Sequence, residues 1–510
     1  MNSDFNNKIK KKIVNTNQLL KKTKNQEFVL CHGAFDIVHP GHLRQFVYAK
    51  KFARILVVSL TSDEFITKDS LRPYVNEELR SLNLASYEII DYVIIDRNSE
   101  PYKLLKKIKP NFFVKGFEYQ NLQNSKTVKE KKILKDINCK FIFSPGDVVF
   151  SSSAFIKSTK PNIKYEKLFT LLKSENLKVS DLKNIVNKFK NLKISIIGDT
   201  IVDKYSKSSV IGGIHKSPTI SVKILEEKNF IGGAAIVAMH LASTGAKINF
   251  SSVIGKDPMS NYVIKSFKKF KNINTNFLSK EDRPTTVKNN IIVGNHKLLK
   301  IDTVENNSIN SSEINYLCNK KFLNCDGVIL SDFRHGIFNK INIKQIFKLI
   351  KKIKYKIADT QVASRWGNLT EFNNFDLVTP NEKEVRFALA DQDTVLRPLG
   401  KLLMDKINCK NLFITLGSDG VISIRGKNYK RSSFHLDSLV ENLVDPVGAG
   451  DAFLSYSALS MVIENNDIAS VIIGSIASKI SCETFGNIPI GKDLVLAYLD
   501  KLSDIESSIF

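Results

Sequence analysis

Two short clusters of chemically useful residues stand out in the sequence. His39 and His42 lie three residues apart in "FDIVHPGHL", with Pro40 directly after the first of them. Proline suits the first position of a helix because an N–H there has no partner anyway, and residues three apart lie on one helix face. The first turn of a helix also presents unpaired N–H groups and the positive end of the dipole. Two imidazoles at that place predict a triphosphate site in which they stabilise the charge of a leaving pyrophosphate.

Two further roles are compatible with the histidine pair. It can cap and pack the helix start without any catalytic function. A metal site is less favoured, because no further histidine, cysteine or acidic cluster accompanies the pair in this part of the chain. The neighbouring stretches "CHGAFD", "RPYVNEELR", "FVKGFEY" and "FSSSAFI" each stand where a strand is expected to run into a helix or loop. Because strand ends of a parallel sheet converge on one crevice, this context favours phosphate binding.

The second cluster is "DPVGAGDAF", in which Gly448, Ala449 and Gly450 precede Asp451 at an expected helix start. A glycine turn that leads into a helix offers backbone N–H groups to a phosphoryl group. A carboxylate beside that turn can take the proton of an attacking hydroxyl. The motif therefore predicts a phosphotransfer site, with a tight turn and an acidic helix cap as the alternative.

Other stretches would support such a site. "TLGSDG" forms a second glycine turn at a strand end, and "GGAAIVA" opens a helix with a diglycine that permits close approach. "TPNEKEV" places Asn381 and Glu384 at i, i+3 spacing, which suits two side chains that hold water around Mg²⁺. "GDTIVD" places acidic residues at the end of a strand.

The bulk composition narrows the class of protein. A chain of 510 residues is long enough for two or three domains. Its net charge of +25 is scattered rather than gathered in one block, which favours phosphorylated small molecules over nucleic acid as partners. Six cysteines without a CxxC pair predict free thiols in the cytoplasm. The apolar runs are too short for a membrane span and the N-terminus lacks the apolar core of a secretory signal, so we expect no membrane partner.

The elements that must position these clusters form two α/β patterns. Short apolar runs alternate with helical stretches, which predicts parallel sheets with crossover helices. We expect a tail over residues 1–26, a Rossmann-like domain over 27–157, a helical linker over 158–191 and a second α/β domain over 192–505. Extended polar and apolar alternation over 208–225 and 285–303 predicts a small β lid. Such a lid could pair between two subunits, so a homodimer is possible.

Residues 27–156 resemble the cytidylyltransferase family of nucleotidyltransferases through "GAFDIVHPGH", "RPYVN" and "VKG". Within that family they look most like the adenylyltransferase half of the bifunctional heptose kinase/adenylyltransferases. The resemblance implies that His39 and His42 bind the triphosphate and stabilise the transition state, while a substrate phosphate displaces pyrophosphate with Mg²⁺ assisting. The nucleotide-pocket residues that it implies are Gly33, Phe35, Asp36, Lys50, Arg80, Lys115, Gly116, Ser151, Ser152 and Ser153.

Residues 192–502 resemble the ribokinase/PfkB carbohydrate kinases through "GDTIVDKY", "PTTVK", "SDFRHG" and "DPVGAGD", again most closely in the heptose enzymes. This resemblance implies Asp451 as the catalytic base and ATP as phosphoryl donor. The other residues that it implies are Gly448, Ala449 and Gly450 for the anion hole, Thr415, Gly417 and Gly420 for ATP, Asp203, Gly232 and Gly233 for the sugar, and Asn381 and Glu384 for Mg²⁺ through water.

The two halves together predict consecutive steps in making an activated sugar. We expect C1 phosphorylation of a heptose 7-phosphate type of sugar, and nucleotidyl transfer to a sugar 1-phosphate that gives ADP-heptose or a related product. The domain order is the reverse of that in the bifunctional heptose enzymes. Two alternatives stay open: a CTP-using transferase with a kinase for another sugar or polyol, and one half retained as a binding module. Ile236 replaces the usual asparagine of the kinase motif and would indicate the second of these alternatives, a kinase half that binds sugar without turnover.

Overall fold

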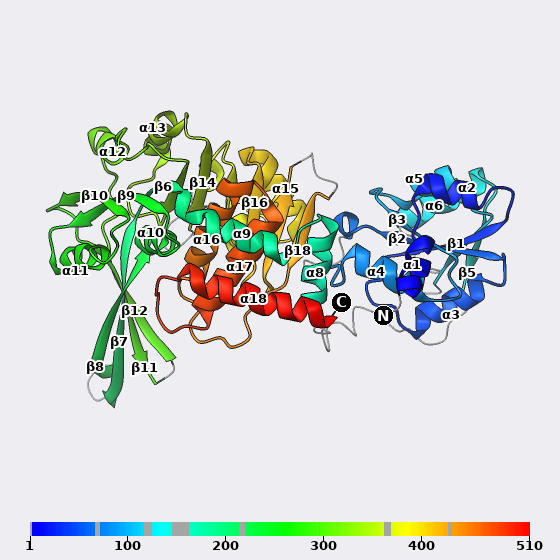
Figure 1. Ribbon diagram of the computed structural model, residues 1–510, viewed down its shortest axis with the longest axis horizontal. Helices are drawn as coiled ribbons and strands as arrows, with labels where there is room; N and C mark the ends of the chain where they lie inside the picture. The colour runs from blue at the N-terminus through cyan, green and yellow to red at the C-terminus, as the bar shows by residue number, and fades with distance from the viewer. Residues whose placement is uncertain are drawn as a thin grey trace. The chain divides into compact units, whose positions relative to one another are not determined.

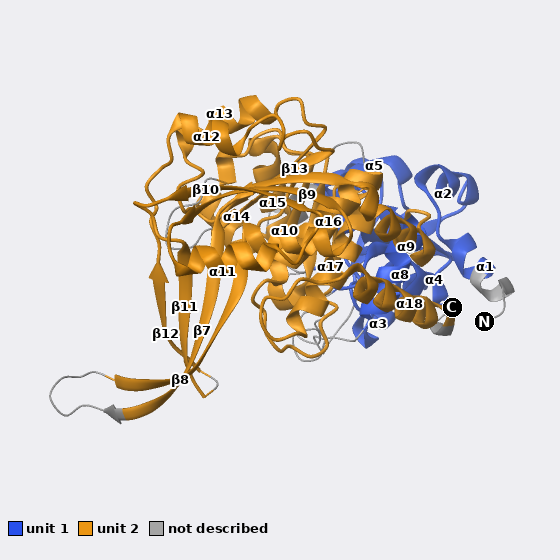
Figure 2. Cartoon of the chain, turned by 60° about the vertical axis from the view of Figure 1, so that its left-hand side comes forward, with its two compact units in different colours: residues 1–174, 509–510 blue, residues 175–508 orange. Residues whose placement is uncertain are grey.

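The chain folds as two compact units of the predicted α/β class (Figures 1 and 2). The computed structural model describes residues 3–66, 72–116, 125–144, 163–213, 220–294, 296–361, 369–426 and 431–509. Unit 1 comprises residues 1–174 and 509–510, and unit 2 comprises residues 175–508. The division therefore falls inside the stretch 158–191 that we expected to be a linker, where the described residues form one α-helix in each unit.

A five-stranded parallel sheet in the order β3-β2-β1-β4-β5 organises unit 1. Its strands are β1 (Phe28–Gly33), β2 (Ile55–Thr61), β3 (Tyr92–Asp96), β4 (Phe112–Lys115) and β5 (Lys140–Phe143). The central strands are rich in Val, Ile, Leu and Phe because helices cover both sheet faces. The chain runs from β1 through β2 to β3 and then crosses over to β4 on the other side of β1, so the strand order reverses between β1 and β4. The crevice at the carboxyl ends of these two strands is the expected ligand site.

The helices of unit 1 begin earlier in the chain than expected. They are α1 (Ser3–Lys12), α2 (Thr16–Lys22), α3 (Pro40–Ala49), η1 (Asp63–Phe65), α4 (Glu77–Ser86), α5 (Pro101–Ile108), α6 (Ser125–Asp136) and α8 (Lys164–Ser174). Residues 1–26 were expected to form a tail, but α1 and α2 belong to the folded unit. Val14 N donates to Val93 O at 2.9 Å, and Leu19 is fully buried. These contacts hold the N-terminal segment against the rest of unit 1.

A nine-stranded sheet in the order β10-β9-β6-β13-β14-β15-β16-β17-β18 forms the body of unit 2. Only the pairs β16/β17 and β17/β18 of this sheet are antiparallel. The strands are β6 (Lys193–Gly198), β9 (Lys247–Gly255), β10 (Ile273–Lys280), β13 (Gly327–Asp332), β14 (Tyr355–Thr360), β15 (Leu377–Val378), β16 (Asn411–Thr415), β17 (Val421–Arg425) and β18 (Ser433–Leu436).

Helices cover both faces of this sheet. Those of unit 2 are α9 (Val179–Lys188), η3 (Phe189–Asn191), α10 (Ala234–Ser243), α11 (Pro258–Phe267), α12 (Ser311–Leu317), α13 (Lys340–Ile350), η4 (Leu369–Glu371), α14 (Glu382–Leu389), α15 (Leu396–Ile407), η5 (Gly417–Asp419), α16 (Ala449–Glu464), α17 (Asp467–Cys482) and α18 (Lys492–Ile509). Helix α16 packs between α10 and α17. The sheet and helices α12 to α15 together form an apolar core, which includes Leu330, Ile346 and Leu412.

A separate four-stranded sheet projects from the body of unit 2 (Figure 1). Its order is β12-β11-β7-β8, with β7 (Thr200–Gly213), β8 (Ile220–Gly233), β11 (Thr286–Val293) and β12 (His296–Thr303). The predicted β lid is therefore present, and β7 begins only one residue after β6 ends. This continuity carries residues of the lid directly to the edge of the main sheet.

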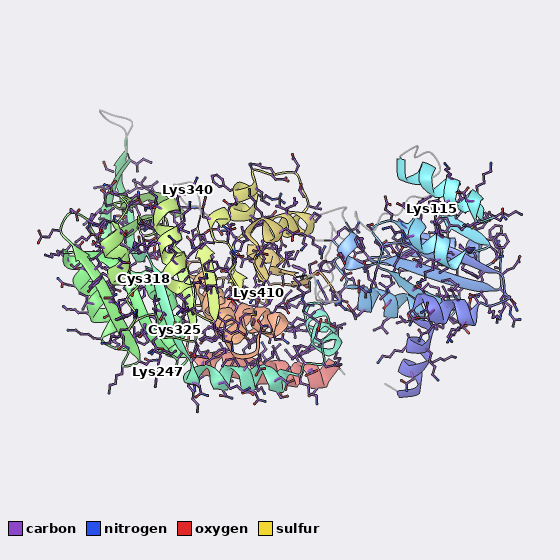
Figure 3. The ribbon with its side chains drawn as sticks, turned by 90° about the horizontal axis from the view of Figure 1, so that it is seen from above. Lys115, Lys247, Cys318, Cys325, Lys340 and Lys410 are labelled. Atoms are coloured by element: carbon purple, nitrogen blue, oxygen red, sulfur yellow. The ribbon has the colours of Figure 1, made fainter. Side chains whose placement is uncertain are left out.

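Lysines lie on separate elements of both units, as Lys115 of unit 1 and the exposed Lys247, Lys340 and Lys410 of unit 2 illustrate (Figure 3). Within the described part of the chain, no helix is both long enough and apolar enough to cross a membrane.

Candidate active sites

His39 and His42 occupy the first turn of α3, as their spacing predicts. His39 is the N-cap, and its Nδ1 accepts from Gly41 N at 3.2 Å. His42 Nδ1 accepts from His39 N at 3.4 Å. The two rings stack with centroids 3.9 Å apart. The histidines therefore cap the helix and also stand together at the carboxyl end of β1.

This capping arrangement sets the tautomer of both rings. An Nδ1 that accepts a backbone hydrogen bond carries no proton, so the neutral ring must be protonated at Nε2. Burial, together with the neighbouring His39, lowers the pKa of His42 to about 3. His42 is thus a neutral Nε2–H donor over the whole physiological range. Paired donors at a helix N-terminus suit the oxygens of a polyphosphate.

The turn between β1 and α3 depends on three of the predicted residues. Phe35 has a φ of 47°, a left-handed conformation that is uncommon outside glycine. Its ring contacts His42 edge-on at 5.1 Å and lies within 3.2 Å of the place where a Cβ of Gly33 would stand. Asp36 accepts from Tyr74 N and Val75 N at 3.0 and 2.8 Å, so it anchors the segment before α4. The structure thus brings Gly33, Phe35 and Asp36 next to the histidine pair.

Arg80 and Lys115 lie at the same end of the sheet but are engaged with other residues. The Arg80 side chain is 0% exposed; it donates to Ala34 O and Thr61 O and pairs with Asp63. Arg80 therefore holds the turn between β1 and α3 in place. Lys115 ends β4 and pairs with Glu130 on α6, and Gly116 follows it as a buried residue.

His32 is a further residue of this site that no sequence motif had indicated. It is the penultimate residue of β1, and its Nδ1 lies 3.0 Å from Ser59 Oγ. Burial lowers its pKa to about 4, with a contribution from Lys115. In the sequence, only its position near the end of an expected strand pointed to it, and many buried side chains occupy such positions.

Lys50 does not join this site. It is the C-cap of α3 and pairs with Asp91. The ten residues of α3 separate it from the histidine turn by about 15 Å at 1.5 Å per residue. The structure therefore does not bring Lys50, which was predicted to line the nucleotide pocket, next to the histidine pair. Ser151, Ser152 and Ser153 lie outside the described residues.

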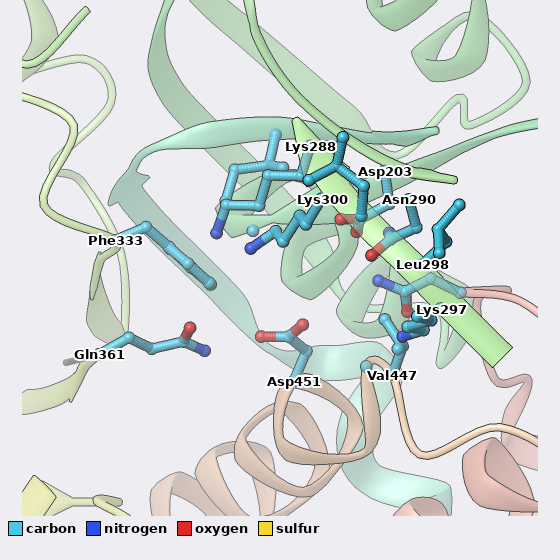
Figure 4. Close-up of a pocket in the computed structure, with 15 residues that line it drawn as sticks. Asp203, Lys288, Asn290, Lys297, Leu298, Lys300, Phe333, Gln361, Val447 and Asp451 are labelled. Atoms are coloured by element: carbon cyan, nitrogen blue, oxygen red, sulfur yellow. The ribbon is translucent and has the colours of Figure 1, made fainter. Parts of the chain in front are cut away.

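In unit 2, a cavity of about 620 Å³ opens at the N-terminus of α16 (Figure 4). Asp451 extends into it from the first turn of that helix, opposite Asp203 and Lys288 of the lid sheet. Phe333 and Gln361 form another side of the cavity. The structure thus brings together Asp451, Gly448, Asp203 and Gly233, four residues predicted from distant motifs.

Asp451 has the environment of a proton acceptor. It is 7% exposed, and its Oδ1 has no hydrogen-bond partner among the described residues. Burial raises the pKa of Asp451 well above its usual range, and the charges of Asp359 and Asp203 raise it further, while Lys288 lowers it. A carboxylate with a raised pKa is a stronger base than an ordinary aspartate, as general-base catalysis at neutral pH requires.

The diglycine before α10 is needed for the placement of Asp203. A Cβ on Gly232 would overlap Asp203 Oδ2. Gly232 is paired with Ile201 across β8 and β7, and Asp203 is its diagonal neighbour two residues further along β7. Gly233 has a φ of 61°, and a Cβ there would overlap Asp199 O. These close approaches explain why the motif contains two glycines.

Three lysines in the cavity were not among the predicted site residues. Lys288 comes from β11, and Lys297 and Lys300 come from β12. Lys288 is the direct partner of Asp203 in the parallel pairing of β11 with β7. Lys288 lies in the "PTTVK" stretch and Lys300 in the "LLKID" stretch of the resemblance to the kinases, but nothing local shows which lysines of a basic chain face a ligand.

The glycine turns have the backbone geometry that their motifs predict. Gly448 has a φ of 82° and is the N-cap of α16; Ala449 and Gly450 begin the helix. At the end of β16, Thr415 leads into η5, with Gly417 and Gly420 at φ values of 59° and 92°. Thr415 also bridges to Asn381, so these two predicted residues are neighbours.

Asn381 and Glu384 have a structural role in addition to the one predicted for them. Asn381 Oδ1 accepts from Glu384 N at 2.9 Å, and Glu384 Oε2 accepts from Asn381 N at 2.8 Å. This reciprocal capping box begins α14. Within the described residues, no group of three His, Cys, Asp or Glu side chains could hold a metal ion. The chemistry fits a Mg²⁺ ion that phosphates and water hold, with few protein oxygens.

Ile236, the residue that departs from the kinase motif, belongs to the core. It is fully buried within α10 and is not among the residues that line the cavity. Its apolar side chain packs in the core of unit 2.

Comparison with known proteins supports both units. Residues 191–491 match the pfkB family of carbohydrate kinases, and residues 30–165 match the cytidylyltransferase-like family. These matches confirm the predicted combination of a kinase domain with a nucleotidyltransferase domain.

Curated relatives are similar over part of their length. The chain is 23% identical over 308 residues to "Bifunctional protein HldE" of Histophilus somni (strain 129Pt), and 26% identical over 306 residues to that of Helicobacter acinonychis (strain Sheeba). These matches cover 59% and 57% of this chain, and 63% and 64% of the relatives. The chain therefore spans less than two thirds of the length of the curated relatives it matches.

Solved structures confirm the ribokinase-like fold. Arabidopsis thaliana ribokinase complexed with ribose and ATP has a TM-score of 0.50 at 17% identity, covering 60% of this chain and 98% of that one. Escherichia coli phosphofructokinase-2 in complex with substrates and products has a TM-score of 0.50 at 16% identity, and the match covers 61% of this chain and 99% of that one. At these identities the likeness concerns the fold alone.

Proposed function

The chain belongs to the PfkB family of carbohydrate kinases, and on that basis we propose that unit 2 phosphorylates a hydroxyl of a sugar phosphate with ATP. The acceptor oxygen attacks the γ-phosphorus of ATP, a new O–P bond forms, and the bond to the bridging oxygen breaks to release ADP. Asp451 takes the proton of the acceptor hydroxyl. The N-terminus of α16 from Gly448 to Gly450 lies where it can stabilise the phosphoryl group. Bound Mg²⁺ would screen the phosphate charges, and Asn381 and Glu384 are our proposed supports for it through water.

This proposal rests on the cluster of lysines that lines the part of the cavity formed by the lid sheet, where we place the sugar. Lys288, Lys297 and Lys300 line it together with Asp203 (Figure 4). A free sugar needs hydrogen-bonding groups but no excess of positive charge. Three ammonium groups suit an acceptor that carries its own phosphate ester. This supports a phosphorylated sugar of the heptose 7-phosphate type, with the C1 hydroxyl as acceptor.

Replacing Lys300 with methionine tests the sugar-phosphate assignment. Loss of one charge-assisted contact of about 1.5–3 kcal/mol is expected to raise the KM for a sugar phosphate by roughly 10–100-fold. The KM for ATP should stay unchanged. Lys223→Met, which removes an exposed charge on β8 of the same lid, is the matched control. Equal effects of the two variants, or a wild type that phosphorylates the free sugar as well as its phosphate, would refute the assignment.

We propose that unit 1 transfers a nucleotidyl group from ATP to a sugar 1-phosphate. A phosphate oxygen of the sugar attacks the α-phosphorus, an O–P bond forms, and the bond to pyrophosphate breaks. The Nε2–H groups of His39 and His42 would donate to the polyphosphate as negative charge shifts to the leaving group. The resemblance of residues 27–156 to the adenylyltransferase half of the heptose enzymes supports an ADP-heptose type of product. A CTP-using transferase is the alternative, and the nucleotide in the product distinguishes the two.

We also propose that the lid sheet pairs two copies of the chain. Eight large apolar side chains of this sheet are between 41% and 65% exposed: Val210, Ile211, Ile220, Ile224, Leu225, Leu298, Leu299 and Ile301. Exposed apolar groups in such number mark an interaction surface. A second copy would present the same sheet, as a twofold interface requires.

Sedimentation of a lysine variant tests this pairing. Ile224→Lys on the lid is expected to shift the protein from dimer to monomer, because a charge would be buried at the interface. Ile341→Lys serves as control, since Ile341 is 79% exposed on α13, outside the lid. A wild type that sediments as a monomer at high concentration would contradict the pairing.

We propose that the reactions take place in the cytoplasm. All six cysteines are free thiols, and five of them are buried. Free thiols are typical of reducing compartments.

A further inference from the structure

Asn487 is a buried polar residue that none of the motifs accounts for. It is 3% exposed and lines the same cavity as Asp451. Neither its Oδ1 nor its Nδ2 has a hydrogen-bond partner among the described residues. A buried polar group without a partner costs about 1–3 kcal/mol, and such groups in a ligand cavity point to a contact that the ligand provides.

The carboxamide of Asn487 lies directly against the anion-hole turn. A Cβ on Gly448 would overlap its Oδ1, so only glycine at position 448 allows the two to meet. Gly448 is the N-cap of α16, three residues before Asp451. The amide, the helix N-terminus and the proton acceptor thus share one end of the cavity.

Asp445 holds the two loops in this arrangement. Its Oδ1 accepts from Val447 N at 3.1 Å, and its Oδ2 accepts from Gly486 N at 3.3 Å. One carboxylate therefore anchors the residue before Gly448 and the residue before Asn487. The backbone adds two bonds, from Val444 N and Asp445 N to Cys482 O, at 2.8 and 3.0 Å. The fold consequently sets the position of Asn487.

From this geometry we propose that Asn487 is a further catalytic residue of the kinase site, whose amide N–H donates to a non-bridging oxygen of the phosphoryl group in transit. This inference rests on the proposed kinase function of unit 2. The backbone N–H groups at the start of α16 provide one set of donors, and Asn487 adds a side-chain donor from the opposite loop. A donor aimed at developing charge in a buried site stabilises the transition state more than the bound substrate. Rotation of the amide by 180° exchanges the positions of Oδ1 and Nδ2, so the N–H can face the phosphoryl group in either starting orientation.

Two substitutions at this position test the proposal. Asn487→Ala removes the donor, and its kcat is expected to fall by on the order of 10²-fold. KM values for both substrates should stay within about threefold, because the contact forms mainly in the transition state. Asn487→Asp keeps the shape but places a negative charge against the phosphoryl group, so its kcat should fall further. Asn442→Ala, which truncates an exposed asparagine outside the cavity, is the control and should match the wild type.

A binding measurement separates this inference from the proposed function. MgADP with fluoroaluminate, a mimic of the phosphoryl group in transit, is expected to raise the melting temperature of the wild type beyond MgADP alone. Asn487→Ala should lose the additional shift and keep the shift from MgADP. If the wild type shows the fluoroaluminate shift, Asn487→Ala loses it, and the wild type phosphorylates no sugar phosphate, the proposed function is refuted and the inference is supported.

Three results would overturn the role of Asn487. The first is a kcat within about threefold of wild type in both variants. The second is a fluoroaluminate shift that persists in Asn487→Ala, or that is absent from the wild type. The third is a raised KM for the sugar phosphate with unchanged kcat, which would assign the amide to ground-state binding of the acceptor.

Discussion

Replacing Asp451 with asparagine is expected to lower the rate of sugar phosphorylation by about 10²–10⁴-fold while making unit 2 more stable. The rate falls because asparagine cannot accept the proton of the acceptor hydroxyl. The stability rises because burial and the neighbouring Asp359 and Asp203 disfavour the charged form of Asp451. Initial rates and melting temperatures of the purified variant, without nucleotide, measure the two effects.

The pH dependence of this effect has a definite sign. A carboxyl group whose pKa is higher in the folded protein than in the unfolded chain binds its proton more tightly when folded. Its contribution to stability is complete at low pH and is lost as pH rises through the folded pKa. The gain in melting temperature from Asp451→Asn should therefore be larger at pH 8 than at pH 5. In the wild type, kcat should fall on acidification through the same raised pKa. A variant that is active, or that loses stability at alkaline pH, would contradict the role of Asp451.

Replacing His42 with alanine is expected to lower nucleotidyl transfer by about 10²–10³-fold and to leave the kinase rate unchanged. The variant loses an Nε2–H donor in the first turn of α3 and the acceptor for His39 N. Because the pKa of His42 is about 3, this residue should produce no change in the transfer rate between pH 5 and 8. The measurement is pyrophosphate release that depends on a sugar 1-phosphate.

Two variants control for loss of the helix cap. His42→Asn retains an amide donor and should recover part of the rate if donation is the role of this residue. Lys50→Met, at the other end of the same helix, should transfer at the wild-type rate despite losing its pair with Asp91. If Lys50→Met were as impaired as His42→Ala, the triphosphate could not be bound at the N-terminus of α3 alone.

The parts of both sites that could be predicted are those in which chemistry and backbone geometry share one short segment. The turns before α3 and α16 are examples, because proline, glycine and capping residues impose the helix start as well as supply the donors. The two sheets were predictable because their strands are short apolar runs between helical stretches. The lid was predictable from alternation, although its continuity with β6 was not.

Other residues could not be assigned from local patterns. The i, i+3 spacing of Asn381 and Glu384 is equally that of a capping box, which is the role the structure shows. Lys50 follows the histidine pair closely in sequence, but a rigid helix carries it away from the site. Asn487 and Lys300 become neighbours of Asp451 only through tertiary folding, from a loop and from the lid respectively. Their types are common in this lysine- and asparagine-rich chain, so residue type alone does not distinguish them from surface residues.

One end-point assay by mass spectrometry tests the central claim that the two units perform two steps of sugar activation. The protein is incubated with Mg²⁺, ATP and CTP, with heptose 7-phosphate in one reaction and heptose 1-phosphate in another. We predict a heptose bisphosphate in the first reaction and ADP-heptose with pyrophosphate in the second. Asp451→Asn should lose only the first product, and His42→Ala only the second. Failure of the wild type to convert either sugar, while the protein still binds ATP, would contradict the claim.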